Sequence, residues 1–98
     1  MLSELMREIA KRLISLDLNG TLNLAKEALE EGYSAHEILS EGISKGMEGV
    51  GNLFEKKEYF LADLVTASYI VEKAIGQLQE RLRSEVEKER HRGKVIFG

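Results

Sequence analysis

The two histidines are the side chains in this sequence best suited to metal binding or proton transfer at neutral pH. His36 falls at the start of a predicted helix, and His91 falls in a charged stretch near the C-terminus. Neither has a second histidine at the spacing of a zinc site, and the sequence contains no cysteine. We therefore expect both histidines to lie on the surface, and we predict no metal ligand in this chain.

The acidic residues and glycines give no better support for catalysis. No Glu-x-x-His pair occurs, although two such pairs are expected of a di-iron helical bundle. Adjacent acids such as Glu30 and Glu31 fall at predicted solvent-facing positions, which does not favour a general acid/base pair. The sequence also lacks the Gly-x-x-x-x-Gly-Lys-Ser/Thr loop that binds nucleotide phosphates. The residue types alone therefore predict no catalytic residues.

The segment Glu58-Tyr59-Phe60-Leu61 is harder to explain by folding alone, because it places two aromatic side chains directly after a charged stretch. Two interpretations are open. Phe60 can serve as a hydrophobic staple that packs against Leu64 at the start of a helix. Alternatively, Phe60 can cover a large, flat apolar ligand.

The composition limits the classes of protein to be considered. The 98 residues are enough for one domain with one modest hydrophobic core. A net charge of −3 argues against nucleic acid as a partner, which needs concentrated positive charge. No apolar run is long enough to span a bilayer, and the N-terminus lacks the apolar region of a signal peptide. We expect a cytoplasmic protein that has no membrane partner.

Apolar residues recur at helical spacing in four segments, which cover residues 2–16, 22–32, 34–54 and 64–82. Residues 17–20, Asp-Leu-Asn-Gly, are predicted to form a turn, and Ser-Ala-His-Glu at 34–37 has the spacing of a capping box. With no proline and short connections, the pattern predicts an all-α protein, an antiparallel up-down four-helix bundle. Its predicted buried residues are Leu13, Leu29, Ile43, Met47, Val50, Leu53, Phe54, Val71, Ile75 and Leu78.

The third helical segment contains Gly42, Gly46, Gly49 and Gly51. Each glycine inside a helix costs about 1 kcal/mol relative to alanine, so the four together cost about 4 kcal/mol. The usual compensation is close approach of another helix, and Gly42 and Gly46 lie one turn apart on one side. A kink or a break in the helix is the other explanation.

The C-terminal part changes character twice. After Leu82 the chain is almost purely charged as far as Gly93, as in a solvated helix extension or a linker. Residues 94–98, Lys-Val-Ile-Phe-Gly, then have the composition of a β-strand. We assign residues 1–90 to the helical domain. Residues 91–98 are expected to be a linker and the start of the first strand of an absent domain.

The spacing of glycine and phenylalanine between residues 46 and 61 resembles a known family. Gly-Met-Glu-Gly-Val-Gly-Asn-Leu-Phe at 46–54, followed by Phe60-Leu61, is similar to the helical cap of B12-binding (corrinoid) methyltransferase proteins. Cobalamin-dependent methionine synthase and the corrinoid proteins of methanol and methylamine methyltransferases belong to this group. Residues 25–32 resemble the second helix of the same cap, and residues 93–96 resemble the start of its Rossmann-like cobalamin-binding domain.

This resemblance implies a cofactor, cobalamin, and a role for specific residues. Phe60 matches the phenylalanine that covers the upper face of the corrin, where a methyl group is bound to cobalt. The following helix would supply further apolar contacts to the cofactor, for which Leu64, Ala67 and Ile70 are the candidates. The cap would exclude water from the methyl group until a partner methyltransferase displaces it.

Two departures from the family pattern matter. Ala62 stands where proline often follows Phe-Leu, and the Asp-x-His-x-x-Gly motif that supplies the lower axial histidine is absent. We therefore expect no enzymatic activity and weak or no cobalamin binding from this chain alone. Its implied partners are the missing cobalamin-binding domain and corrinoid methyltransferases, and exposure of residues 59–70 would favour homo-oligomers.

Several alternatives stay open at this point. The chain can be a fragment or a complete gene product, and it can belong to a methyl carrier or to a B12-sensing regulator. A cofactor-free helical module for interaction or oligomerisation is the alternative function. The methyl donor is not encoded in these residues, because a separate methyltransferase selects it.

Overall fold

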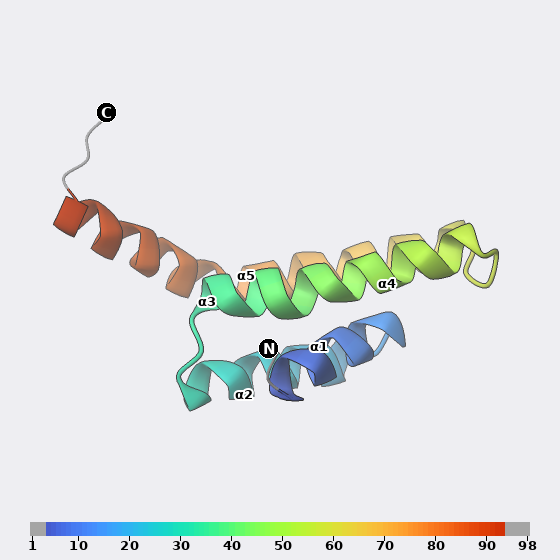
Figure 1. The fold of residues 1–98 in the computed structure, drawn as a ribbon, viewed down its shortest axis with the longest axis horizontal. Coiled ribbons are helices and arrows are strands. Elements are labelled where there is room, and N and C mark those ends of the chain that lie inside the picture. The colour runs from blue at the N-terminus through green and yellow to red at the C-terminus, as the bar shows by residue number, and fades with distance from the viewer. Residues whose placement is uncertain (1–3, 94–98) are drawn as a thin grey trace.

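Residues 4–93 are described by the computed structural model, and almost all of them are helical (Figure 1). The elements are α1 (Glu4–Ile14), α2 (Leu18–Glu31), α3 (Ala35–Glu37), the π-helical segment η1 (Ile38–Ile43), α4 (Ser44–Glu55) and α5 (Leu61–Gly93). Because α3, η1 and α4 follow one another without a break, the described part of the chain forms four antiparallel helical rods. It contains no strand. The predicted all-α, up-down bundle is confirmed.

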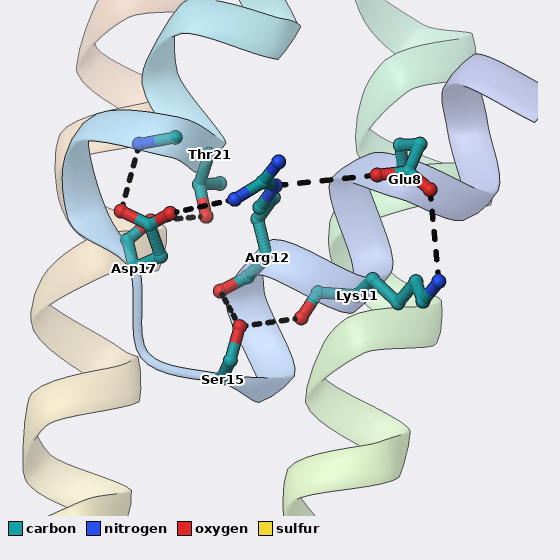
Figure 2. A network of polar contacts seen from close by, with 7 residues as sticks. Glu8, Lys11, Arg12, Ser15, Asp17 and Thr21 are labelled. Atoms are coloured by element: carbon teal, nitrogen blue, oxygen red, sulfur yellow. Dashed lines mark hydrogen bonds and ion pairs between the residues drawn. The ribbon is translucent and has the colours of Figure 1, made fainter.

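The connection between α1 and α2 is shorter than predicted. Asp17 is the N-cap of α2, and its side chain accepts a hydrogen bond of 3.0 Å from the amide of Gly20. Residues 18–20 are therefore already helical, and the prediction of a turn over 17–20 was wrong. An N-terminal aspartate that accepts from the third amide after it lets a helix begin at once. Figure 2 shows Asp17 between this amide and the guanidinium of Arg12, at 3.2 Å.

The start of the third rod is bonded from two directions. Ser34 accepts a hydrogen bond of 3.0 Å from the amide of Glu37, and the Glu37 carboxylate accepts one of 3.4 Å from the Ser34 amide, which confirms the predicted capping box. Glu85 of α5 accepts from the amides of Ala35 at 2.7 Å and His36 at 3.2 Å. Four consecutive amides that a helix start leaves unpaired thus have acceptors.

Three of the four glycines in the third rod allow α1 to approach closely. A Cβ atom at Gly42 would lie 3.0 Å from the side chain of Ile9, and one at Gly46 would lie 2.8 Å from Leu13. At Gly49 it would lie 2.5 Å from Ile14, whereas at Gly51 it would meet no atom within 4 Å. The close-approach interpretation is confirmed for the first three glycines. The helix is also irregular here, because Gly42 lies within the π-helical segment.

The core lies where α1 packs on α2 and α4 and where α5 packs on α2, α3 and α4. Of the predicted core residues, Leu13, Ile43, Val50 and Leu78 are fully buried, and Leu29, Met47, Leu53 and Val71 are half-buried. The prediction was wrong for two residues that are exposed, Phe54 and Ile75.

The two errors have a common origin in the helical period. The buried row of α5 runs through Ala67, Ile70, Ala74 and Leu78, so Ile75 falls on the neighbouring side of the helix. In α4 the row through Gly46 and Val50 continues to half-buried Leu53, and this leaves Phe54 outside it. The apolar face of each helix is wider in the sequence than the face that is buried in the structure, and both residues lie on its exposed margin.

The charged stretch after Leu82 continues α5 as a helix, in agreement with the first of its two interpretations. In Figure 1 this part of α5 extends beyond the other helices. The predicted strand at 94–98 lies outside the described residues, so the boundary between the two expected domains stays a prediction. Within residues 4–93, no helix is both long and apolar enough to cross a membrane.

Candidate functional site

The loop between α4 and α5, residues 56–60, is held by its own backbone. The amides of Lys56 and Lys57 donate hydrogen bonds of 3.0 Å to carbonyl groups in the last turn of α4. The amides of Glu58 and Tyr59 both donate to the carbonyl of Leu53, at 2.9 and 3.1 Å. Lys57 adopts a left-handed conformation, with φ of 67°, which turns the chain toward α5. Four of the five loop amides are thus bonded to the last turn of α4, which restricts the motion of the loop.

Phe60 ends the loop and precedes the first residue of α5. Its amide donates a hydrogen bond of 2.8 Å to the carboxylate of Asp63, and its carbonyl accepts from the amides of Asp63 and Leu64. The backbone of Phe60 is therefore fixed on both sides, while its side chain is 67% exposed. The positions that a hydrophobic staple uses fall on Tyr59 and Leu64, which are both half-buried against the core. Phe60 does not pack as a staple would.

The first two turns of α5 carry a row of exposed apolar side chains beside Phe60. Leu61 is 68% exposed, Val65 is 62% exposed and Tyr69 is 48% exposed. Spacing by four residues places these three on one side of the helix. We call Phe60, Leu61, Val65 and Tyr69 the α5 apolar surface. Grouped exposed apolar side chains are typical of interaction sites, so these four residues are the candidate site.

The four site residues predicted from the resemblance do not all share this surface. Phe60 belongs to it, and Leu64 is half-buried at its margin. Ala67 and Ile70 are fully buried in the bundle. Sequence reasoning missed Leu61, Val65 and Tyr69. The sequence does contain a second row of apolar residues in α5, beside the buried row. A search for a single apolar stripe treats the two rows as one.

The chemistry that this surface offers is apolar contact. The ammonium of Lys73 lies 5.3 Å from the centre of the Tyr69 ring and places a positive charge at the margin of this surface.

His36 is exposed at the start of the third rod and is therefore far along the chain from the α4–α5 loop, which follows the end of that rod. Among the side chains that the structure describes, residues 4–86, no cluster of three possible metal ligands is present, and His91 lies outside this range.

Comparison of the sequence with known protein families identifies the family to which this chain belongs. The family model of the B12 binding domain matches residues 5–79. The chain belongs to the B12 binding domain family. The match covers all of α1 except Glu4, the complete second and third rods, the α4–α5 loop and the buried part of α5. The resemblance stated from residues 46–61 is therefore confirmed.

Individual members of the family agree with this result. The chain is 34% identical over 91 residues to monomethylamine corrinoid protein 2 of Methanosarcina barkeri, which covers 93% of this chain and 40% of that protein. It is 34% identical over 74 residues to trimethylamine corrinoid protein 2 of Methanosarcina acetivorans, which covers 76% of this chain and 34% of that protein. The chain thus spans well under half the length of these corrinoid proteins.

The solved structure of the Methanosarcina barkeri monomethylamine corrinoid protein has the same helical fold over the shared part. The two superpose with a TM-score of 0.73 at 33% sequence identity, covering 87% of this chain and 38% of that one. This B12 binding domain therefore has the cap fold of a corrinoid protein. The residues that would touch a cofactor stay a prediction.

Proposed function

We propose that this domain is the helical cap of a corrinoid methyl-carrier protein and covers the upper face of the corrin. The observation that carries the proposal is the α5 apolar surface, in which Phe60 ends a loop with hydrogen-bonded amides and Leu61, Val65 and Tyr69 lie in the helix that follows. A corrin is a large, nearly flat ring. Contact with such a ring would remove the exposed phenylalanine, leucine, valine and tyrosine side chains from water, which is favourable for apolar groups.

Phe60 is proposed as the central contact with the ring, and Leu61, Leu64 and Val65 would extend the contact along α5. Ala67 and Ile70, which the resemblance placed with them, pack beneath this surface. They would reach the cofactor only if α5 moved away from the other helices. None of these side chains supplies a metal ligand, so anchoring of the cofactor falls to a cobalamin-binding domain.

In this function the cap acts by exclusion. Apolar side chains over a reactive methyl group keep water and other nucleophiles away from it. Displacement of the cap then gives a corrinoid methyltransferase access, so that motion controls reactivity. The cofactor itself supplies the methyl-transfer chemistry when it is bound. We place this activity in the cytoplasm, with the methyltransferases as partners.

A chimaera tests the proposal. This chain replaces the matching segment of the Methanosarcina barkeri monomethylamine corrinoid protein, and the chimaera is loaded with methylcobalamin. We expect Phe60→Ala and Val65→Ala to preserve cofactor binding but to speed photolysis, since the upper face becomes open to solvent. Val86→Ala is the matched control, because Val86 is 57% exposed on the same helix but lies outside the α5 apolar surface. Equal photolysis rates in all four proteins would refute the proposed function.

The isolated 98-residue chain provides a second readout in the same series. Titration with methylcobalamin should give weak or undetectable binding, because a cap contacts only one face of the ring. Tight, stoichiometric binding by this chain would contradict the division of labour between cap and anchor.

The same exposed surface also favours a second candidate function, self-association without a cofactor. Light scattering of the wild type and Phe60→Ser at matched concentration separates the two. A dimer that Phe60→Ser abolishes, together with unchanged photolysis in the chimaera, would support the oligomerisation module in place of the cap.

A further inference from the structure

Tyr59 joins the α4–α5 loop to a distant part of the chain. Its hydroxyl donates a hydrogen bond of 2.6 Å to the carbonyl oxygen of Ile14. Ile14 is the last residue of α1, and the last carbonyl groups of a helix have no partner within that helix. The side chain of Tyr59 thus satisfies an acceptor at the end of α1 and fastens the loop there.

The turn after α1 leaves this acceptor available. The amides of Ser15, Leu16 and Asp17 donate to the carbonyl groups of residues 11, 13 and 12, respectively. The carbonyl group of Ile14 follows these three along the chain and accepts the hydrogen bond from the Tyr59 hydroxyl. The ring of Tyr59 is half-buried against the core, so both the ring and the hydroxyl hold the side chain in place.

The consequence concerns the next residue. Tyr59 is directed into the bundle and Phe60 away from it, and they are joined by a single peptide bond. With Tyr59 fastened to α1 and the Phe60 amide bonded to Asp63, the exposed ring of Phe60 projects from a backbone that is bonded on both sides. A contact group that is fixed before binding loses less conformational entropy when it binds.

We propose that Tyr59 is the positioning residue of the cap: its bond to Ile14 sets where the Phe60 ring stands relative to the end of α1 and to the rest of the α5 apolar surface. This inference rests on the proposed function, because it assigns Tyr59 a role toward the cofactor through Phe60. It also connects the glycine contacts to the site. Gly49 packs against Ile14, the same residue whose carbonyl accepts from Tyr59.

The first test uses Tyr59→Phe, which removes the hydroxyl and keeps the ring. Tyr33→Phe is the matched control, because Tyr33 is also half-buried and its hydroxyl makes no hydrogen bond to the described side chains or backbone of residues 4–86. Hydrogen exchange is followed by NMR on the 98-residue chain. We expect Tyr59→Phe to speed exchange of the amides of residues 58–60 about five- to tenfold, as loss of one hydrogen bond predicts. Exchange in the middle of α1 and α2 should not change.

A merely structural role would give a different pattern. If the hydroxyl served only global stability, exchange of the slowest core amides would accelerate and the loop would show no separate effect. That result, or equal exchange in Tyr59→Phe and Tyr33→Phe, would overturn the inference.

The second test is photolysis of methylcobalamin in the chimaera, with Phe60→Ala measured beside Tyr59→Phe. We expect Tyr59→Phe to speed photolysis by part of the Phe60→Ala effect. A faster reaction in Phe60→Ala with no change in Tyr59→Phe would overturn the positioning role and leave the cap function intact. No change in Phe60→Ala would overturn both, whatever the exchange rates of the loop.

Discussion

Two glycines five residues apart in α4 should respond in opposite ways to the same substitution, Gly→Ala. A Cβ atom at Gly46 would lie 2.8 Å from Cδ2 of Leu13, 3.0 Å from its Cβ and 3.2 Å from Cα of Ala10. Leu13 is fully buried, and the Cα of Ala10 belongs to the backbone of α1, so neither can move away easily. A Cβ atom at Gly51 would meet no atom within 4 Å.

The magnitudes follow from two opposing effects. Alanine gains about 1 kcal/mol over glycine inside a helix at either position. Overpacking a tight contact costs about 1–3 kcal/mol, and contact with a backbone atom places Gly46 near the upper end of this range. We therefore expect Gly46→Ala to lower the free energy of unfolding by about 2 kcal/mol, from a cost of about 3 less a gain of about 1. Gly51→Ala should raise it by about 1 kcal/mol.

Urea and thermal unfolding followed by far-UV circular dichroism measure both effects. At about 4–8 °C per kcal/mol for a domain of this size, Gly51→Ala should raise the Tm and Gly46→Ala should lower it by about twice as much. Gly76→Ala is a further control, because a Cβ atom at this exposed position of α5 also meets nothing within 4 Å. Shifts of the same sign and size at residues 46 and 51 would show that α1 does not approach α4 as described.

Two further predictions concern the helix starts. Asp17→Ala should lower the free energy of unfolding by about 1 kcal/mol, because the N-cap of α2 is lost. Asp17→Asn keeps the acceptor and loses only the exposed ion pair with Arg12, so it should change the free energy of unfolding by less than about 0.5 kcal/mol. Equal losses for the two variants in urea unfolding would refute this assignment. Glu85→Ala should cost about 1–2 kcal/mol, because it leaves the amides of Ala35 and His36 without their acceptor. Faster hydrogen exchange at these two amides would confirm the mechanism, and unchanged exchange would contradict it.

Local sequence signals were sufficient to predict the four helical segments and some of their ends. The Ser34–Glu37 capping box and the left-handed Gly32 that ends α2, with φ of 106°, follow from the preferences of single residues for particular backbone shapes. The wrong turn at 17–20 arose because Asp-x-x-Gly fits both a turn and a helix start. Only the contact between Asp17 and the Gly20 amide separates the two.

The candidate site depended on facts that no local pattern contains. The apolar spacing in α5 is compatible with two neighbouring rows, and the sequence does not state which row faces α2, α3 and α4. Packing buries the row of Ala67, Ile70, Ala74 and Leu78 and leaves Leu61, Val65 and Tyr69 exposed. This packing removed two of the four predicted contact residues, Ala67 and Ile70, from the surface.

The identity of Phe60 as a residue of interest was determined by the sequence, because an aromatic side chain after a charged loop is visible there. Local bonds to Asp63 and Leu64 hold its backbone, and only the tertiary structure adds the anchor through Tyr59. The hydrogen bond from Tyr59 to Ile14 spans 45 residues of sequence, and so does not appear in any helical period or capping motif. Likewise, Glu85 caps a helix that starts 50 residues earlier. Periodicity and capping act over a few residues, whereas these two contacts exist only because antiparallel helices bring distant ends of the chain together.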